Sequence, residues 1–586
     1  MTEKRRRRWI VIGSLGLLMA ATVALTWPVI LHMDTSVVGH LDHPGLQGDL
    51  FFQWNIGRQM EEGGTVDYLR SRYTRFPEGQ EFRAKVAFSL HLALYTLFMC
   101  VTDLLTARNL AVLLVLFLNA AAAWRLGWER FRSPVFAIVF ALLFAFSPFV
   151  YLKLNQGFLQ KATLFYLPLF VLFFLRLLEH HRVRDAVGSA VFLNIGLLVY
   201  PPSLVFSSLL GLALMLGAGI QRLRWRSLVR PFVVFCLCVL PCVVMVLLVG
   251  KDDFVMAHKM QLDLGSFRSQ GGYLDLFHPF RFFPYLGTFP GQPAQAFIER
   301  LPLGLPLFPL LLAFIAAFLA RRRLAGWLLG FSLAAAVVMA GPYLMNSGQL
   351  VEIGGRVVVL PLLLLDRLPL GQAFRFPIRL FPWLQMALLL AAGQGFLWLK
   401  DQMKAWDRFP QVAVLTPVLL GLLILAEPRV LFPEYRTFHT QTLVRPAYCG
   451  MPCVQNGDAV LHLPYLAPGI HRYQFEAVLC DVAIMNPVKR ASSPVEIPPA
   501  DASEEQMRQF LEVLAQYGIG SIIVHTDLYR LMEEKRYADA PSLGPVERGL
   551  TGDDVQAWLE KLLGPPLSPA GSEILVFEVS SPTAPR

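Results

Sequence analysis

The stretch RRRRWIVIGSLGLLMAATVALTWPVIL, residues 5–31, decides the fold class of this chain. Four arginines stand directly before an apolar segment, and about 20 mainly apolar residues are enough for a helix to cross a bilayer. The segment is too long for the apolar core of a typical signal peptide, and no small-residue cleavage site is obvious. We therefore expect an uncleaved span whose N-terminus is cytoplasmic, because Lys and Arg favour that side.

The composition extends this interpretation to most of the chain. The protein has 586 residues, of which 55% are hydrophobic and only 16% are charged, whereas soluble proteins carry about 25% charged residues. We predict a polytopic α-helical membrane protein with about 11 spans. Besides residues 9–31, the candidate spans are 107–126, 133–152, 158–178, 185–200, 203–219, 229–250, 301–320, 324–345, 376–399 and 409–430.

Basic loops set the expected orientation of the spans. The net charge of +10 does not indicate nucleic-acid binding, because many basic residues cluster in short loops between apolar runs. All of these loops are cytoplasmic only if residues 86–105 form a re-entrant or interfacial segment. If residues 86–105 are instead a full span, every later loop is inverted. We favour the first arrangement. The loops are 125–132, 180–184, 222–226, 321–323 and 400–408.

The favoured topology places most of the polar sequence outside the cell. We predict a transmembrane domain, 1–432, with outer loops 33–106, 251–300 and 346–375, and an extracytoplasmic α/β domain, 433–586. Strand-like runs at 459–463, 521–525 and 574–577 alternate with helical patterns, and Ser503 to Gln506 form a capping box. No Walker-type phosphate loop is present. His525-Thr526-Asp527 lacks a nucleophile at a known distance, so we interpret it as structural.

The cysteines of the tail suggest a disulfide. The polar tail contains Cys449, Cys453 and Cys480. If the tail is extracytoplasmic, these cysteines are in an oxidising compartment, where disulfides form. Cys449 and Cys453 are candidates to pair, which leaves Cys480 without a partner. A metal site at Cys449 and Cys453 is the weaker alternative, because no second ligand pair follows at a zinc-like spacing.

The first outer loop carries the acidic candidates. Asp42 and Asp49 are candidate catalytic carboxylates, and His43 and Trp54 are candidate substrate-binding residues beside them. A purely structural interpretation is also open. Asp42 and His43 then cap a turn before Pro44, and Asp49 caps a helix over residues 50–60.

Basic residues on the same predicted face supply a possible phosphate site. Arg375 and Arg379 are four residues apart at the start of a late span, and pairing with a lipid phosphate or with a loop carboxylate would explain them. Lys153 and Lys161 flank a short outer turn, where snorkelling to lipid headgroups is the simpler explanation. His278 is the last candidate, although a lone loop histidine is seldom a ligand.

Several motifs together resemble the bacterial GT-C glycosyltransferases. These are the acidic loop Gly48-Asp49-Leu50-Phe51-Phe52-Gln53-Trp54, the run Phe144-Ala145-Phe146-Ser147-Pro148 at a span end, Phe374-Arg375-Phe376-Pro377-Ile378-Arg379 before a late span, and Asp458-Ala459-Val460-Leu461-His462-Leu463-Pro464 in the tail. The resemblance covers most of the chain, through short motifs. The chain lacks a clear pair of adjacent acids around Asp49, and no motif names the sugar.

The resemblance implies an inverting enzyme of the bacterial inner membrane that moves a sugar from a polyprenyl-phosphate donor to a lipid, glycan or protein acceptor. It assigns the catalytic role to Asp49, with Asp42 second, and lipid-phosphate binding to Arg375 and Arg379. Some members need a divalent cation, so Mg²⁺ or Mn²⁺ is a candidate cofactor with unknown ligands. A lipid or glycan transporter and a non-catalytic scaffold of a polysaccharide-assembly complex are the alternatives.

Overall fold

The structure of the protein is a computed structural model. It describes residues 3–41, 43–63, 66–68, 70–71, 73–74, 79–81, 90–219, 225–249, 273–274, 282–283, 307–346, 349–362, 377–404, 438, 440–455, 459–463, 470–484, 486, 503–533, 552–568 and 573–579.

The chain forms two compact units. The helical unit comprises residues 1–33, 88–94 and 108–440, and the polar unit comprises 34–87, 95–107 and 441–586. The predicted boundary at residue 432 places the loop 33–106 with the membrane helices. By its contacts, most of this loop belongs to the same unit as the tail.

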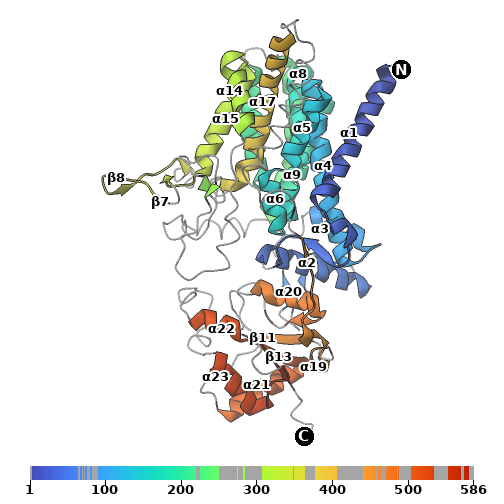
Figure 1. Ribbon diagram of the computed structural model, residues 1–586, viewed down its shortest axis with the longest axis vertical. Coiled ribbons are helices and arrows are strands. Elements are labelled where there is room, and N and C mark those ends of the chain that lie inside the picture. Colours follow the sequence, from blue (N-terminus) through green and yellow to red (C-terminus); the bar gives the residue numbers. More distant parts are fainter. Residues whose placement is uncertain are drawn as a thin grey trace. The chain divides into compact units, whose positions relative to one another are not determined.

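The helical unit is a bundle of apolar helices (Figure 1). Six helices of the described chain are long and apolar enough to cross a membrane, and the described parts of 203–219, 301–320 and 324–345 form shorter apolar helices. The predicted span 185–200 falls in a helix of 17 residues. The predicted span at 409–430 lies outside the described residues. The helices are α1 (Glu3–Leu25), α4 (Leu104–Phe131), α5 (Pro134–Ala145), α6 (Pro148–Asn155), α7 (Leu159–Ala162), α8 (Tyr166–His180), α9 (Val183–Val199), α10 (Ser203–Ala218), α11 (Trp225–Val249), α14 (Leu307–Phe314), η4 (Ile315–Leu319), α15 (Arg323–Met339) and α17 (Phe381–Lys404).

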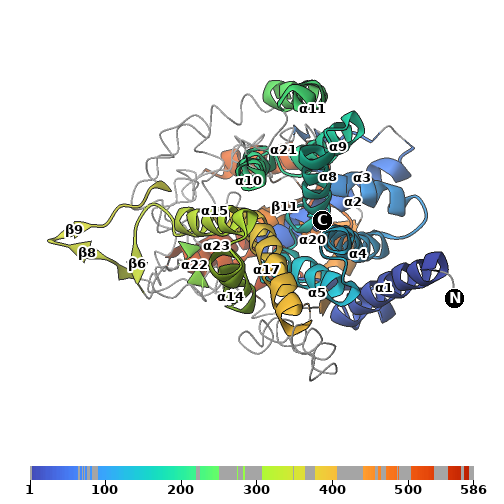
Figure 2. The ribbon, with the colours of Figure 1, turned by 90° about the horizontal axis from the view of Figure 1, so that it is seen from above.

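The bundle exposes apolar side chains where lipid is expected. Figure 2 shows α11 at the edge of the bundle, where it packs against α9. Phe232, Leu237 and Leu240 of α11 are exposed, as are Leu17 and Trp9 of α1. Large exposed apolar side chains along whole helices are costly in water and favourable in a bilayer, so these two helices face lipid.

The connection between α1 and α4 starts and ends at one end of the bundle. The side-chain amide of Asn109, near the start of α4, donates to the carbonyl of Met33 at 2.9 Å, just after α1. Helix α3 (Leu90–Met99) lies between them and has only 10 residues, too few to cross a bilayer. The described part of this segment, residues 90–105, therefore contains no helix long enough to cross a bilayer, which is what the favoured topology expects.

Charged side chains at the opposite end of the bundle are paired. Arg176 of α8 donates to both carboxylate oxygens of Glu129 on α4, and Arg125 lies 3.1 Å from the same carboxylate. Arg130 pairs with Glu179. These contacts join the ends of α4 and α8. Arg176 and Glu179, which a transporter would use to line a path, therefore tie helices together.

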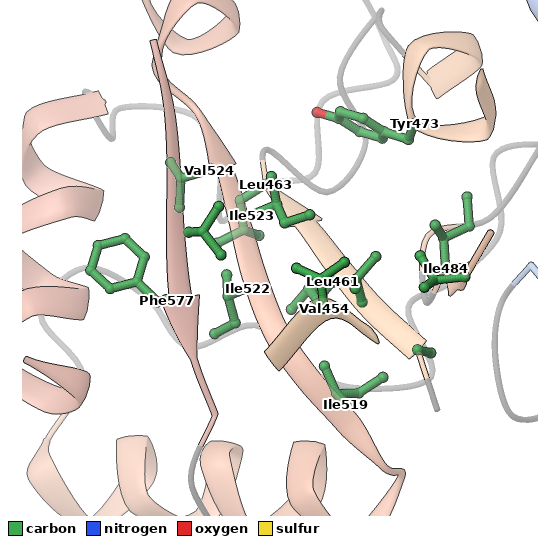
Figure 3. Packing of buried hydrophobic residues seen from close by; sticks show 14 of the residues in the cluster. Val454, Leu461, Leu463, Tyr473, Ile484, Ile519, Ile522, Ile523, Val524 and Phe577 are labelled. Carbon is green, nitrogen blue, oxygen red and sulfur yellow. The ribbon is translucent and has the colours of Figure 1, made fainter. Parts of the chain in front are cut away.

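The polar unit is built on a four-stranded sheet (Figures 1 and 3). The strand order is β12-β11-β13-β14; β11 is parallel to β12 and β13, and β14 is antiparallel to β13. Buried aliphatic side chains from both central strands fill the core, among them Leu461, Ile522 and Val524. The bounds are β11 (Ala459–Leu463), β12 (Ala483–Ile484), β13 (Ile519–His525), β14 (Ile574–Glu578), α20 (Ile470–Cys480), α21 (Glu504–Gln516), α22 (Thr526–Glu533) and α23 (Gly552–Leu563).

Local signals in the sequence place these elements well. The predicted strand at 459–463 is β11, and the predicted helix at 552–563 is α23. The capping box forms: the hydroxyl of Ser503 accepts from the backbone of Gln506, whose side chain accepts from the backbone of Ser503. Capping supplies partners to amides that would otherwise lack them, which explains why α21 begins there.

Helix α2 (Pro44–Glu61) of the first loop packs on α20. Phe51, Trp54 and Tyr73 belong to the same buried cluster as the sheet. The indole of Trp54 donates to Asp481 at 2.8 Å, and Arg58 lies 3.7 Å from the other oxygen of that carboxylate. Strand β1 (Ser36–Val38) also pairs with β10 (Thr440–Thr442). The loop is thus folded into the polar unit by apolar burial and by side-chain hydrogen bonds.

The disulfide differs from the predicted one. Cys449 is bonded to Cys480, and Cys453 is buried with a free thiol. Cys449 and Cys453 are close in sequence, but Cys453 lies in the short helix α19 (Pro452–Gln455), whereas Cys480 ends α20. The bond therefore ties α20 to the segment at the start of the tail.

This pairing can be tested by counting reactive thiols in the denatured protein. The chain has seven cysteines, five of which are free in the structure. We expect maleimide mass tagging to add two further labels after reduction. The Cys449→Ser and Cys480→Ser variants should lose this difference, because each leaves only free thiols. Cys453→Ser should keep it; if Cys453→Ser abolishes the difference, the pairing is the one with Cys453.

Candidate active site

Three basic side chains gather inside the helical unit, at the end remote from the Glu129 pairs. Lys153 ends α6, Lys161 lies in α7, and Arg379 lies in the short helix η6 (Pro377–Leu380) before α17. Arg379 and Lys153 are both close enough to Lys161 to repel its positive charge. We name these three residues the cationic cluster. All three were predicted as substrate-binding residues.

A tight helix end brings the two lysines together. Gly157 has a φ of +77°, which L side chains rarely adopt. The amide of Phe158 donates to the carbonyl of Lys153 at 2.8 Å, and the amide of Gly157 donates to that of Leu154 at 2.9 Å. These two bonds form a Schellman motif, which ends α6 and turns the chain into α7. The ring of Phe158 then lies 3.6 Å from the ammonium of Lys161 and 5.9 Å from that of Lys153.

Neighbouring helices fix the position of α7. The buried amide of Asn119 on α4 donates to the carbonyl of Ala162 at 2.8 Å and accepts from the amide of Leu164 at 2.9 Å. The side-chain amide of Gln160 donates to the carbonyl of Val199 at 2.5 Å. Buried side-chain hydrogen bonds of this kind specify one arrangement, because a shifted α7 leaves polar groups unsatisfied.

Aromatic side chains complete the site. The guanidinium of Arg379 donates to the hydroxyl of Tyr200 at 3.2 Å and lies 5.5 Å from the centre of its ring. Lys161, Arg379, Tyr166, Tyr200 and Trp383 line a small cavity of about 10 Å³, which has room for about one water molecule. Basic and aromatic side chains therefore line one small cavity, and a whole sugar substrate needs more space than this cavity has.

The environment of the lysines contradicts the expectation of snorkelling. Lys153 is only 7% exposed, and its ammonium donates to the side-chain oxygen of Gln156 at 2.7 Å. Among the described residues, Lys161 forms no ion pair, and its ammonium lies over the Phe158 ring. Positive side chains gathered among apolar helices are chemically suited to contact an anion.

Asp49 lies in the second turn of α2, within the polar unit. Helix α2 begins at Pro44, six residues before the predicted start, so Asp49 is not a helix cap. One carboxylate oxygen, Oδ2, accepts from the side-chain amide of Gln53 at 3.1 Å and from the hydroxyl of Tyr95 at 3.2 Å. Tyr95 is fully buried. Two fixed donors orient the carboxylate, and a fixed orientation is a requirement for a general base.

The neighbours of Asp49 have structural roles of their own. His43 is the N-cap of α2, because its Nδ1 accepts from the amide of Gly45 at 2.8 Å. This agrees with the structural interpretation of His43. Trp54 is 6% exposed and packs in the core of the polar unit. Its indole is used for packing and for the bond to Asp481, where substrate contact had been predicted.

The remaining predicted site residues, Asp42, Arg375 and His278, lie outside the described residues. Other residues of the site were missed at the sequence level. In the sequence, Tyr200 and Trp383 are ordinary aromatic residues near the ends of predicted spans, and no motif marks them as functional.

No protein-family model and no curated protein sequence matches the chain. Solved structures do match in overall shape. The arabinofuranosyltransferase AftD from Mycobacteria has 14% sequence identity over 98% of this chain, with a TM-score of 0.46. This chain spans 40% of the AftD chain.

The oligosaccharyltransferase of Archaeoglobus fulgidus also matches. In its apo form it has 10% identity over 90% of this chain and 71% of its own, with a TM-score of 0.49. Its complex with an inhibitory peptide and a dolichol-phosphate has 11% identity over 92% and 71%, with a TM-score of 0.47. Both proteins are glycosyltransferases of the GT-C type. At these identities and TM-scores the likeness is to the general fold, and no residue role is taken from it.

The packing around the cationic cluster can be tested at Gly196 of α9. A Cβ at this position would lie 2.6 Å from the ring of Tyr166, so Gly196→Ala should destabilise the protein by about 1–3 kcal/mol. Gly330→Ala is the matched control, because the same change in α15 meets no atom within 4 Å and should stabilise its helix by about 0.5–1 kcal/mol. Thermal unfolding in detergent should give shifts of opposite sign. A neutral Gly196→Ala would contradict the described packing.

Proposed function

We propose that this protein is a membrane glycosyltransferase that moves a sugar from a polyprenyl-phosphate donor to a lipid, glycan or protein acceptor at the outer face of the membrane. The observation that carries the proposal is the cationic cluster. Its three positive side chains lie among apolar helices, which is where a lipid-linked phosphate, and few other anions, would be found.

The cationic cluster serves the leaving group. During transfer the bond between the anomeric carbon and the phosphate oxygen breaks, and the electron pair stays with the lipid phosphate. Its negative charge grows as the bond lengthens, so preorganised cations stabilise the transition state more than the ground state. Arg379 offers a planar fork of N–H donors, and Lys161 and Lys153 act as point charges. Tyr200 holds the Arg379 fork in place.

Asp49 serves the acceptor. The acceptor hydroxyl forms a bond to the anomeric carbon opposite the departing phosphate and passes its proton to the carboxylate of Asp49. A single displacement of this kind inverts the anomeric configuration. Gln53 and Tyr95 hold one oxygen of this carboxylate, so the carboxylate need not reorient during the step.

A divalent cation is not assigned to this step. Mg²⁺ prefers an octahedron of oxygen ligands. Asp49 belongs to no group of three metal-ligating side chains within the described chain, and one of its oxygens is already used by Gln53 and Tyr95. We therefore derive no step through Mg²⁺ or Mn²⁺.

The role of Asp49 is tested by Asp49→Asn, which keeps the shape and removes the base. Transfer from a labelled polyprenyl-phosphate sugar in membranes should fall by about 10²–10⁴-fold, while the melting temperature changes little. Asp34→Asn is the control, because Asp34 is an exposed acid of the same loop and should retain full activity. Normal turnover by Asp49→Asn would remove Asp49 as the base.

The role of the cationic cluster is tested by Lys161→Gln and Arg379→Gln. Each removes a charge-assisted bond to the leaving phosphate, so kcat/KM for the donor should fall by about 10- to 100-fold, mainly through kcat. Lys161→Arg should restore part of the loss. Arg356→Gln changes an exposed arginine of the helical unit and should have no effect.

The two sets of variants also separate the proposal from a transporter. An enzyme consumes the lipid-linked sugar and releases free lipid phosphate, and Asp49→Asn still binds the donor. A transporter moves the labelled lipid between leaflets without breaking the sugar–phosphate bond. Translocation of intact donor, unchanged in Asp49→Asn, would overturn the glycosyltransferase proposal.

A further inference from the structure

Three ligand-type side chains that the proposed function does not use converge inside the polar unit. His462 Nδ1 lies 3.0 Å from His525 Nε2, and Glu476 Oε2 lies 3.5 Å from the first nitrogen and 3.4 Å from the second. All three side chains are buried, with His525 at 0% and His462 at 1% exposure.

The convergence occurs where open α/β sheets bind ligands. His462 lies near the carboxyl end of β11, and His525 ends the neighbouring parallel strand β13. The chain leaves β11 towards β12 on one side, while β14 follows β13 on the other side. This is a topological switch point, at which the connections diverge and open a crevice between them. Figure 3 shows Tyr473 of α20 near the sheet end that carries Leu463 and Val524.

The surrounding residues hold the three side chains in place. The ring of Tyr473 lies 4.8 Å from that of His462 and 5.0 Å from that of His525. Arg472 donates to Glu476 Oε1 at 3.0 Å, which leaves Oε2 directed at the imidazoles. Asn486 bonds both backbone groups of His462 at 2.8 Å. Such outer contacts are what orient metal ligands in proteins.

Hydrogen bonding alone does not satisfy this triangle. The outward nitrogens, His462 Nε2 and His525 Nδ1, are buried and have no hydrogen-bond partner, and Glu476 Oε2 has none either. If one imidazole donates to the other across the 3.0 Å contact, Glu476 Oε2 is left without a donor; if both inward nitrogens donate to Glu476 Oε2, the two outward nitrogens still have no partner. Either arrangement leaves buried polar atoms unsatisfied, which is costly.

We infer that His462, His525 and Glu476 bind one Zn²⁺ ion. With Zn–N and Zn–O bonds of about 2.0–2.1 Å, neighbouring ligand atoms of a tetrahedral site lie roughly 3.3–3.4 Å apart. The three distances of 3.0, 3.4 and 3.5 Å match this spacing without any movement of the backbone. Two imidazoles favour Zn²⁺ over Mg²⁺ and Mn²⁺, which prefer oxygen ligands. A water molecule takes the fourth position.

The ion would fasten α20 to the sheet. Glu476 is the ligand from α20, and its neighbour Phe475 packs against the apolar cluster of Val37, Leu46 and Leu50. Leu50 adjoins Asp49, so the metal supports the helix pair that positions this carboxylate. Its role is in folding and positioning, because the site is closed to a sugar substrate.

Metal content of the full-length protein tests the inference without any activity assay. We expect about one zinc per chain in the wild type and less than about one-tenth in Glu476→Gln and His525→Gln. His180→Gln is the matched control, since His180 is exposed at the end of α8 and should leave the zinc content unchanged. In the metal-stripped wild type, Co²⁺ should give the visible bands of a tetrahedral site, and Zn²⁺ should raise the melting temperature.

Two outcomes overturn the inference. One is zinc retained at the wild-type level in Glu476→Gln and His525→Gln. The other is a stripped wild type that neither binds Zn²⁺ nor gains thermal stability from it, which would leave the three side chains as a metal-free polar network. The second test uses the unaltered chain, so a variant that fails to fold does not obscure the result. Neither outcome depends on whether sugar transfer is detected.

Discussion

A charged side chain inside a bundle of apolar helices needs a partner of opposite charge. This constraint explains which charged residues are found at the two ends of the helical unit. At one end the match is internal. Glu129 accepts from Arg176, and Glu179 pairs with Arg130, so α4 and α8 are fastened together. At the other end Lys153, Lys161 and Arg379 gather, and within the described chain Lys161 has no carboxylate partner. Gathering positive charge among apolar helices is costly, which is why the proposed function gives this end of the unit an anionic ligand.

The polar unit follows a different rule, which is burial of apolar surface. Helix α2 of the first loop and α20 of the tail are more than 400 residues apart in sequence, yet they share one core with the sheet. The contacts of Trp54 with Asp481 and of Phe475 with Leu50 hold α2 on α20. The orientation of the Asp49 carboxylate is therefore a property of the folded polar unit, through Tyr95 and Gln53.

Features of local origin were predictable. The apolar runs identified the membrane helices, and capping residues and strand patterns placed β11, α21 and α23. The basic residues Lys153, Lys161 and Arg379 were recognised because positive charge at the predicted outer ends of spans violates the usual bias. The burial of Lys153 was not predictable, since snorkelling and burial begin from the same residue and differ only in which way the helix faces.

The sequence by itself determined the class of the protein. Hydropathy and basic loops can be recognised within one helix and its flanking loops, so tertiary contacts are not needed. It also determined which residue types are available for acid–base and phosphate chemistry. The tertiary structure decided the partners. Cys449 bonds Cys480 and not the nearer Cys453, and His462, Glu476 and His525 meet from three separate elements. Pairings of this kind depend on how helices and strands pack. The spacing of residues in the sequence carries no information about that packing.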